Sequence, residues 1–80
     1  MNNLDSIGKR AAHAIRQRAR ENRIPHWREC ATLGLHQTTM EGWERRGYCP
    51  SAYWLQQMAL AGYDVVWILT GEDKHDCGSL

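Results

Sequence analysis

A short run of polar side chains stands near the middle of the 80-residue chain. Gln37, Thr38 and Thr39 come first, and Arg45 and Arg46 follow. Glutamine can form two hydrogen bonds with adenine, threonine can bond a base edge or touch a thymine methyl group, and arginine can bind guanine or phosphate. Side chains of these types, in this order, are suited to hydrogen bonding with the edges of DNA bases.

These side chains need a short helix to present them, and residues 26–47 predict two short helices joined by a tight turn. Gly34 lies in the turn and is expected to take a positive φ, a conformation that is cheap only for glycine. Cys30 on the first helix and Met40 and Trp43 on the second are the expected inward positions. The outward positions of the second helix are His36, Gln37, Thr38, Thr39, Glu41, Gly42, Arg45 and Arg46. A short helix of this kind, held at an angle by a glycine turn, has a shape that fits the major groove of DNA.

Glu29 fits this pair of helices least well, because it stands where an apolar side chain is expected. Two arrangements are compatible with the sequence. Either Glu29 faces outward and Trp27 or Cys30 fills the gap, or the first helix of the pair is rotated slightly. An ordinary helical hairpin in a small bundle is the alternative interpretation of the turn.

Apolar residues at three- and four-residue spacing predict a helix before this pair, over residues 6–21. Asp5 or Ser6 can cap it by accepting a hydrogen bond from a free backbone N–H group. Pro25 is expected in the first turn of the next helix, where its missing N–H group costs nothing. That next helix should end near Thr32.

Further helices are expected downstream. The helix with the polar outward positions covers residues 37–46 and is followed by a loop. Ser51 can cap a fourth helix that ends at Gly62, and Asp64 can cap a fifth helix over residues 65–69. The sequence contains no alternating strand pattern of any length. The predicted fold class is therefore all-α, as a compact five-helix bundle.

The chain has the length of one small domain. It is expected to comprise a flexible start (residues 1–5), the helical domain (6–71) and a flexible tail (72–80). No stretch of about 18 apolar residues predicts a membrane span, and no apolar signal segment stands at the start. A cytoplasmic location is expected.

Neither catalytic nor metal-binding patterns stand out in the sequence. It has no Ser-His-Asp set, no phosphate-binding glycine loop and no paired acid site. The three cysteines form no CxxC pair and are expected to stay free, in a reducing compartment. A metal site at His75 and Cys77, with Asp73 or Asp76, lacks a second pair of ligands and is not favoured. We therefore expect no enzyme, no cofactor and no metal.

Charge is unevenly distributed along the chain, although the net charge is only +1. Residues 1–50 hold nine Lys and Arg residues against five Asp and Glu residues, a net charge of +4, whereas residues 51–80 hold one against four, a net charge of −3. Such an uneven distribution of charge is typical of a protein that binds phosphate groups through one face. A solvated, arginine-rich helix face is the alternative.

Candidate phosphate contacts lie outside the polar helix as well. Arg16, Arg20 and Arg23 fall on one side of the first predicted helix, because four and three residues separate them. They are expected to flank the DNA, with solvated surface as the alternative. Tyr48 follows the polar helix and is a further candidate.

The tryptophans are better explained by packing than by base stacking. Trp43, Trp54 and Trp67 fall on apolar faces and are expected in the core. Tyr63 is expected at the rim of the domain.

Three segments carry a resemblance to a known family. The first is the turn at Gly34 followed by a polar helix start, the second is MEGWERRG over residues 40–47 with Pro50 soon after, and the third is GYDVVWILTGE over residues 62–72. Across residues 7–72 the chain resembles the DNA-binding domain of bacteriophage CI-type repressors and the wider lambda repressor-like (Cro/C1, XRE) helix-turn-helix family.

The resemblance implies a five-helix bundle in which the second and third helices form a helix-turn-helix and the third is the recognition helix. It also implies a homodimer that binds an inverted-repeat operator with half-sites about one helical turn apart. The implied base-facing residues are Gln37, Thr38, Thr39 and Glu41 or Gly42, with His36 at the helix start and Arg45 and Arg46 on phosphate or flanking bases. A Cro-sized regulator or an isolated repressor domain is expected.

Dimerisation would have to come from the bundle itself. The fourth and fifth helices are the expected surface, because Tyr53, Trp54, Val65 and Val66 offer more apolar area than one small core needs.

The leading hypothesis is a sequence-specific regulator of transcription that binds double-stranded DNA, expected to be a repressor from a phage or mobile element. The alternative is a protein-interaction module on the same fold, such as an antirepressor, an anti-activator or an antitoxin-like adaptor. The modest net charge and the carboxylates of Glu41 and Glu44 are compatible with a protein-interaction module. A third hypothesis is an architectural DNA-binding factor with little sequence preference.

Overall fold

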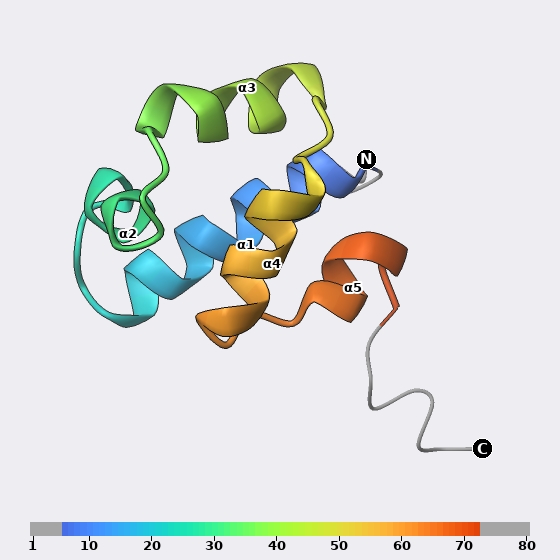
Figure 1. Cartoon of the computed structure of the whole chain (residues 1–80). Helices are drawn as coiled ribbons and strands as arrows, with labels where there is room; N and C mark the ends of the chain where they lie inside the picture. The colour runs from blue at the N-terminus through green and yellow to red at the C-terminus, as the bar shows by residue number, and fades with distance from the viewer. Residues whose placement is uncertain (1–5, 73–80) are drawn as a thin grey trace.

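Five helices make up residues 6–72, the part of the chain that the computed structural model describes. They are α1 (Ile7–Glu21), α2 (His26–Thr32), α3 (Gln37–Arg46), α4 (Ala52–Leu60) and α5 (Val65–Thr70), and no strand occurs among these residues (Figure 1). The predicted all-α class with five helices is therefore confirmed. The ends predicted to be flexible, residues 1–5 and 72–80, lie outside the described residues except for Glu72, as do Asp73, His75, Asp76 and Cys77. No helix within the described range combines the length and the hydropathy that crossing a membrane requires.

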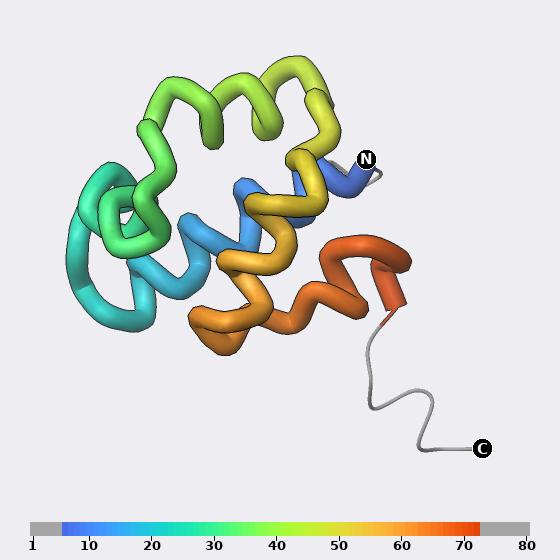
Figure 2. The backbone as a smooth tube through the Cα atoms, in the orientation of Figure 1, coloured from blue at the N-terminus to red at the C-terminus, as the bar shows by residue number. Residues whose placement is uncertain are grey.

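The longest helix, α1, holds the other elements together. It packs against α2, α3 and α5, while α2 contacts α3 and α4 contacts α5. Figure 2 shows α1 passing through the middle of the molecule, with α3 across one side of it. The packed face of α1 carries Ala11, Ala12 and Ile15, which have no exposed surface. Small side chains at these positions let the neighbouring helices approach closely.

Polar side chains begin two of the helices as predicted. Ser6 Oγ accepts a hydrogen bond from the N–H group of Lys9 at 3.1 Å, and Asp64 Oδ1 accepts one from the N–H group of Trp67 at 3.1 Å. Ser51 occupies the N-cap position of α4, but its side chain makes no capping hydrogen bond. The predicted capping residues thus hold for α1 and α5, while the predicted capping bond at Ser51 is absent.

The helix bounds differ slightly from the predictions. Pro25 lies at the N-cap of α2 and not in its first turn, because its ψ of 152° is extended. The carbonyl oxygen of Pro25 accepts a hydrogen bond from the N–H group of Arg28 at 3.0 Å. Helix α4 stops at Leu60, ahead of Gly62 with its φ of 93°, and α5 continues to Thr70.

The core contains the inward residues that the sequence predicts. Cys30, Met40 and Trp43 are buried together with side chains of α1. Trp54 and Trp67 are half-buried against this cluster. The expectation that these tryptophans pack inward is confirmed.

Glu29 is buried on α2, so the arrangement in which it faces outward is wrong. Its Oε2 accepts a hydrogen bond of 2.6 Å from the hydroxyl group of Tyr63, which is buried as well and does not lie at the rim as expected. A buried carboxylate needs such a donor, and the helix is turned so that Glu29 faces inward while Trp27 is 54% exposed. Burial, followed by the bond to Glu29, raises the pKa of Tyr63 far above its ordinary value. The bond ties α2 to the turn before α5.

Helix α1 also makes close contacts with the second half of the chain. A Cβ atom at Gly8 would collide with the backbone carbonyl oxygen of Tyr48, so only glycine lets α1 approach the segment after α3 this closely. Arg10 and Arg18 donate hydrogen bonds to carbonyl groups at the C-terminal ends of α5 and α4, at 2.8 Å and 2.6 Å. These guanidinium groups therefore satisfy carbonyls that a helix end leaves without an internal partner.

Candidate nucleic-acid interface

The turn between α2 and α3 determines where the polar helix begins. Gly34 has a φ of 74°, as expected, and His36 takes the N-cap position of α3. His36 Nδ1 accepts a hydrogen bond from the N–H group of Thr38 at 3.2 Å. A neutral imidazole that accepts at Nδ1 carries its hydrogen on Nε2, so the exposed His36 side chain offers a donor beside the helix start.

The outer face of α3 presents most of the predicted base-facing residues. Four of its side chains are exposed, those of Thr38, Thr39, Arg45 and Arg46. A hollow of about 430 Å³ lies along this face. Its lining consists of Thr38, Thr39, Glu41, Gly42, Trp43, Arg45, Arg46 and Tyr48. The structure therefore brings six of the predicted residues, together with Tyr48, onto one open surface.

The C-terminal end of α3 carries positive charge next to an aromatic ring. Arg46 Nη1 donates a hydrogen bond to the hydroxyl oxygen of Tyr48 at 3.2 Å, and the guanidinium carbon lies 5.8 Å from the ring centroid. The hydrogen bond to Tyr48 raises the pKa of Arg46. Gly47 ends the helix with a φ of 70°. Exposed hydroxyl groups at the helix start are thus followed by cationic groups at its end.

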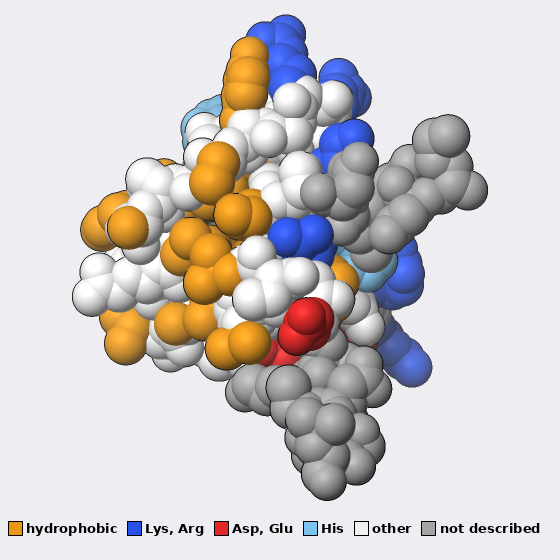
Figure 3. All heavy atoms as spheres, turned by 90° about the vertical axis from the view of Figure 1, so that its right-hand side faces the viewer, with side chains coloured by type: hydrophobic (Ala, Val, Ile, Leu, Met, Phe, Trp, Pro, Cys, Tyr) orange, Lys and Arg blue, Asp and Glu red, His pale blue; other side chains and the backbone are white. Residues whose placement is uncertain are grey.

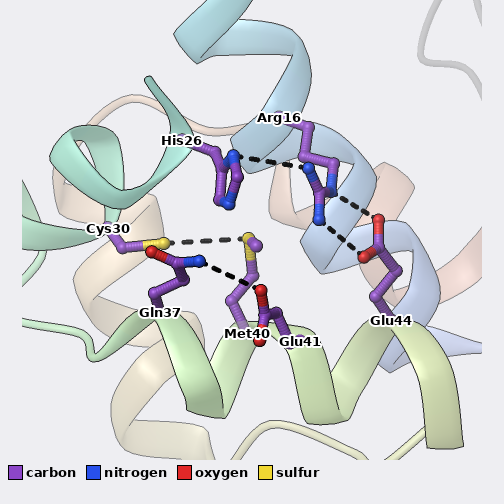
Figure 4. A network of polar contacts seen from close by, with 7 residues as sticks. All are labelled: Arg16, His26, Cys30, Gln37, Met40, Glu41 and Glu44. Carbon is purple, nitrogen blue, oxygen red and sulfur yellow. Dashed lines mark hydrogen bonds and ion pairs between the residues drawn. The ribbon is translucent and has the colours of Figure 1, made fainter. Parts of the chain in front are cut away.

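Arg16 is bound to α3 rather than directed away from it. Its Nε lies 2.5 Å from Glu44 Oε2 and its Nη2 lies 2.8 Å from Glu44 Oε1, so the pair is bidentate (Figure 4). The hydrogen bond to Glu44 raises the pKa of Arg16. Arg20 is exposed on α1. Arg23 is exposed as well, but it lies beyond the end of α1 in a turn, with a φ of 59°, so the expectation that all three arginines share one side of that helix is wrong.

Gln37 and Glu41 are joined along one side of α3 (Figure 4). Both side chains are half-buried, and Glu41 also lines the hollow on the outer face, whereas Gln37 does not. Gln37 Nε2 donates a hydrogen bond to Glu41 Oε2 at 3.0 Å. That bond and the positive charge of Arg45 hold the pKa of Glu41 below its ordinary value. Glu41 is therefore a carboxylate, which can only accept hydrogen bonds.

The network in Figure 4 includes residues that the sequence does not single out. Arg16 Nη1 lies 3.4 Å from His26 Nδ1, and His26 Nε2 is buried without a hydrogen-bond partner. Arg16 and Glu44 are 28 residues apart, so no spacing rule pairs them. The four-residue spacing of Gln37 and Glu41 is a signal that could have revealed their contact.

A second, different surface lies on α4 and α5. Neither helix contains a charged residue, and four of their large side chains are about half exposed or more. These are Tyr53 (56%), Leu60 (77%), Val66 (49%) and Leu69 (45%). Trp54 and Val65, which the sequence also assigns to a dimer surface, are half-buried against the core. Figure 3 shows hydrophobic side chains gathered over the left and centre of the view, with Lys and Arg side chains mainly toward the top and the right.

The molecule thus offers a polar, cationic helix face and an uncharged apolar face. Comparison of the chain with protein-family models, with curated proteins and with solved structures finds no match. What the protein does must therefore be inferred from these side chains and their arrangement.

Proposed function

We propose that this chain is a sequence-specific regulator of transcription that binds double-stranded DNA, in the manner of Cro and CI-type repressors. In this proposal α2, the turn at Gly34 and α3 form a helix-turn-helix in a lambda repressor-like bundle, and α3 is the recognition helix in the major groove. The role requires no reaction and no cofactor, because a bound repressor acts by covering a promoter.

The outer face of α3 is the observation that carries the proposal. Its first turn offers the hydroxyl groups of Thr38 and Thr39, which can bond base edges. Its last turn offers the exposed guanidinium groups of Arg45 and Arg46, which can bind phosphate or guanine. Groups that specify bases and groups that position the protein therefore follow one another along one open helix.

The position of α3 is fixed before any partner arrives. The bidentate contact with Arg16 joins Glu44 to α1, and the imidazole of His36 caps the helix start. An interface that is already ordered loses less conformational freedom on binding, so more of the contact energy appears as affinity. This arrangement supports a rigid recognition helix.

Selection of bound sequences from a random duplex pool, at about physiological salt, tests the proposal directly. We expect a palindromic consensus, because two copies related by a two-fold axis read an inverted repeat. If the folded protein enriches no sequence, the proposal is wrong.

Charge substitutions at Arg45 test whether the assigned face is the one that binds. Arg45→Glu should weaken binding to every sequence and reduce the slope of log K against log salt by about 1, because one phosphate contact is lost. Arg45→Lys keeps the charge and should keep the slope. Equal slopes for Arg45→Glu and the unaltered protein would place the DNA on another face.

The apolar face of α4 and α5 supports the dimer that an inverted repeat requires. An uncharged surface can meet a second copy of itself without repulsion between like charges. Val66→Glu should shift the molecular mass measured by light scattering from dimer to monomer. Gln17→Glu adds the same charge on α1 and should leave the mass unchanged, whereas an unchanged dimer in Val66→Glu would place the dimer surface elsewhere.

A protein-interaction module on the same fold is the second candidate. The carboxylates of Glu41 and Glu44 on α3 and the exposed ring of Trp27 on α2 favour it, because acidic and aromatic groups are less suited to a phosphate surface. A protein binder of this kind should have no salt-dependent affinity for DNA. Failure to enrich any duplex, followed by capture of a single protein that Trp27→Ala releases, would establish it.

A further inference from the structure

The hydrogen bond between Gln37 and Glu41 restricts what the first turn of α3 can read. Gln37 Nε2 donates to Glu41 Oε2 at 3.0 Å, four residues further along the same helix. An amide group can be rotated so that its oxygen and nitrogen exchange places, and the two orientations offer different groups to a base. In the rotated orientation the Gln37 oxygen would face the Glu41 carboxylate, and two acceptors would oppose each other. Glu41 therefore selects one orientation of the amide.

We propose that Glu41 is a positioning residue for Gln37 and makes adenine the base that Gln37 reads. This inference rests on the proposed function. The amide nitrogen of Gln37 carries two hydrogens, and one of them is donated in the hydrogen bond to Glu41. The second hydrogen and Oε1 remain for a base, and this donor and acceptor together match N7 and N6 of adenine. Guanine offers two acceptors, N7 and O6, which this pair of groups does not match.

Glu41 is suited to this positioning role because it stays ionised. It accepts the hydrogen bond from Gln37, and Arg45 lies one turn further on the same helix. Both effects lower the pKa of Glu41, so the carboxylate cannot become a donor near neutral pH. The positive charge of Arg45 also offsets the repulsion between this carboxylate and DNA phosphate.

A positioning role predicts that Glu41→Ala changes specificity and affinity in opposite directions. Loss of the carboxylate frees the Gln37 amide to rotate, so the preference for adenine at the contacted position should fall about tenfold. Loss of a negative charge beside phosphate should leave binding to non-specific DNA equal or stronger. A merely structural residue would weaken both kinds of binding together.

The contacted position can be identified with Gln37→Ala, as the one operator position whose preference that variant loses. Duplexes carrying each of the four base pairs there are then compared for the unaltered protein, Glu41→Ala, Glu41→Gln and the double variant. Glu41→Gln keeps the length of the side chain, but its amide can offer either a donor or an acceptor to Gln37, so it no longer selects one orientation and the adenine preference should fall as it does in Glu41→Ala. The double variant should lose no more than Gln37→Ala alone. Glu21→Ala removes a carboxylate from α1 and serves as the charge-matched control.

The outcomes separate this inference from the proposed function. A consensus with a base other than adenine at that position would overturn the inference and leave the function standing. A full adenine preference in Glu41→Ala or in Glu41→Gln would also overturn the inference and leave the function standing. If the unaltered protein enriches no sequence at all, the proposed function fails and the inference fails with it.

Discussion

The first three helices and the last two differ in the kind of surface that they offer. Residues 7–46 hold nine Lys and Arg residues and four Glu residues, whereas residues 47–72 hold only Asp64 and Glu72. The charged half exposes guanidinium and hydroxyl groups, and the uncharged half exposes tyrosine, leucine and valine side chains. The charged half is therefore suited to a phosphate-bearing ligand and the uncharged half to an apolar partner.

The two halves share one core, and polar groups join them at few points. Glu29 in the charged half accepts from Tyr63 in the uncharged half, and Arg10 and Arg18 of α1 bind carbonyls at the ends of α5 and α4. Gly8 allows the backbone of α1 in the charged half to approach Tyr48, near the start of the uncharged half. Substitutions at these points test how firmly the apolar half depends on the charged half.

The largest effect is expected at the closest contact. Gly8→Ala places a Cβ atom against the carbonyl oxygen of Tyr48, so α1 must move away and stability should fall by about 3 kcal/mol. Gly42→Ala is the matched control, because its Cβ would meet only the Tyr48 ring at 3.4 Å. Alanine there should be neutral or more stable by up to about 1 kcal/mol, owing to its higher helix propensity.

Urea unfolding followed by circular dichroism measures both changes. We expect the changes in the free energy of unfolding caused by Gly8→Ala and Gly42→Ala to differ in sign or by more than about 2 kcal/mol. Equal effects would mean that the backbone contact at Gly8 relaxes without cost.

The next largest effect is expected where a buried polar pair links the halves. Tyr63→Phe removes the donor to Glu29 and leaves a buried carboxylate without its partner, which should cost about 2 kcal/mol. Tyr53→Phe removes a hydroxyl group that accepts a hydrogen bond from Gln57 on an exposed face, and it should cost less than about 0.5 kcal/mol. Thermal and urea unfolding of the two variants measure the difference, and similar costs would show that the buried link contributes little.

Sequence reasoning succeeds where neighbouring residues determine the structure. The apolar spacing of α1 and the positive φ at Gly34 depend on local stereochemistry, so both could be predicted. The bounds of α3 could be predicted too, because Gly47 ends the helix at the point where the polar pattern stops.

The contacts that fix the candidate site join residues far apart in the chain. Glu29 and Tyr63 are 34 residues apart, and Arg16 and Glu44 are 28 apart, so neither pair is visible in a local pattern. The position of Glu29 was informative in one respect, because a charged residue at an inward position of a helix requires a buried hydrogen-bond donor. The sequence could show that a partner was needed but could not identify Tyr63 as that partner.

A smaller effect is expected from the arginine that reaches from one half to the other. Arg18 donates to the carbonyl of Ala61 at 2.6 Å, and its guanidinium carbon lies 3.7 Å from the centroid of the Tyr63 ring. Arg18→Ala should cost about 1.5 kcal/mol, since it loses a hydrogen bond and a cation–π contact. Arg20→Ala, on the exposed side of the same helix, should change stability by less than about 0.5 kcal/mol. Equal values in urea unfolding would show that the arginines of α1 act only as surface charge.

The smallest change in stability is expected at the N-caps of the helices, and one N-cap from each half can be compared. Ser6 Oγ accepts a hydrogen bond from Lys9 N–H, whereas the side chain of Ser51 makes no capping bond. Ser6→Ala should therefore cost about 1 kcal/mol and Ser51→Ala only a few tenths of that. Urea unfolding of both variants, with Ser6→Asn as the variant that restores a capping acceptor, measures the difference. Recovery in Ser6→Asn would assign the loss to the cap itself, because asparagine has no other reason to stabilise that position. Equal losses in the two alanine variants would mean that Ser51 does cap α4 in solution, and the two halves would then begin their helices in the same way.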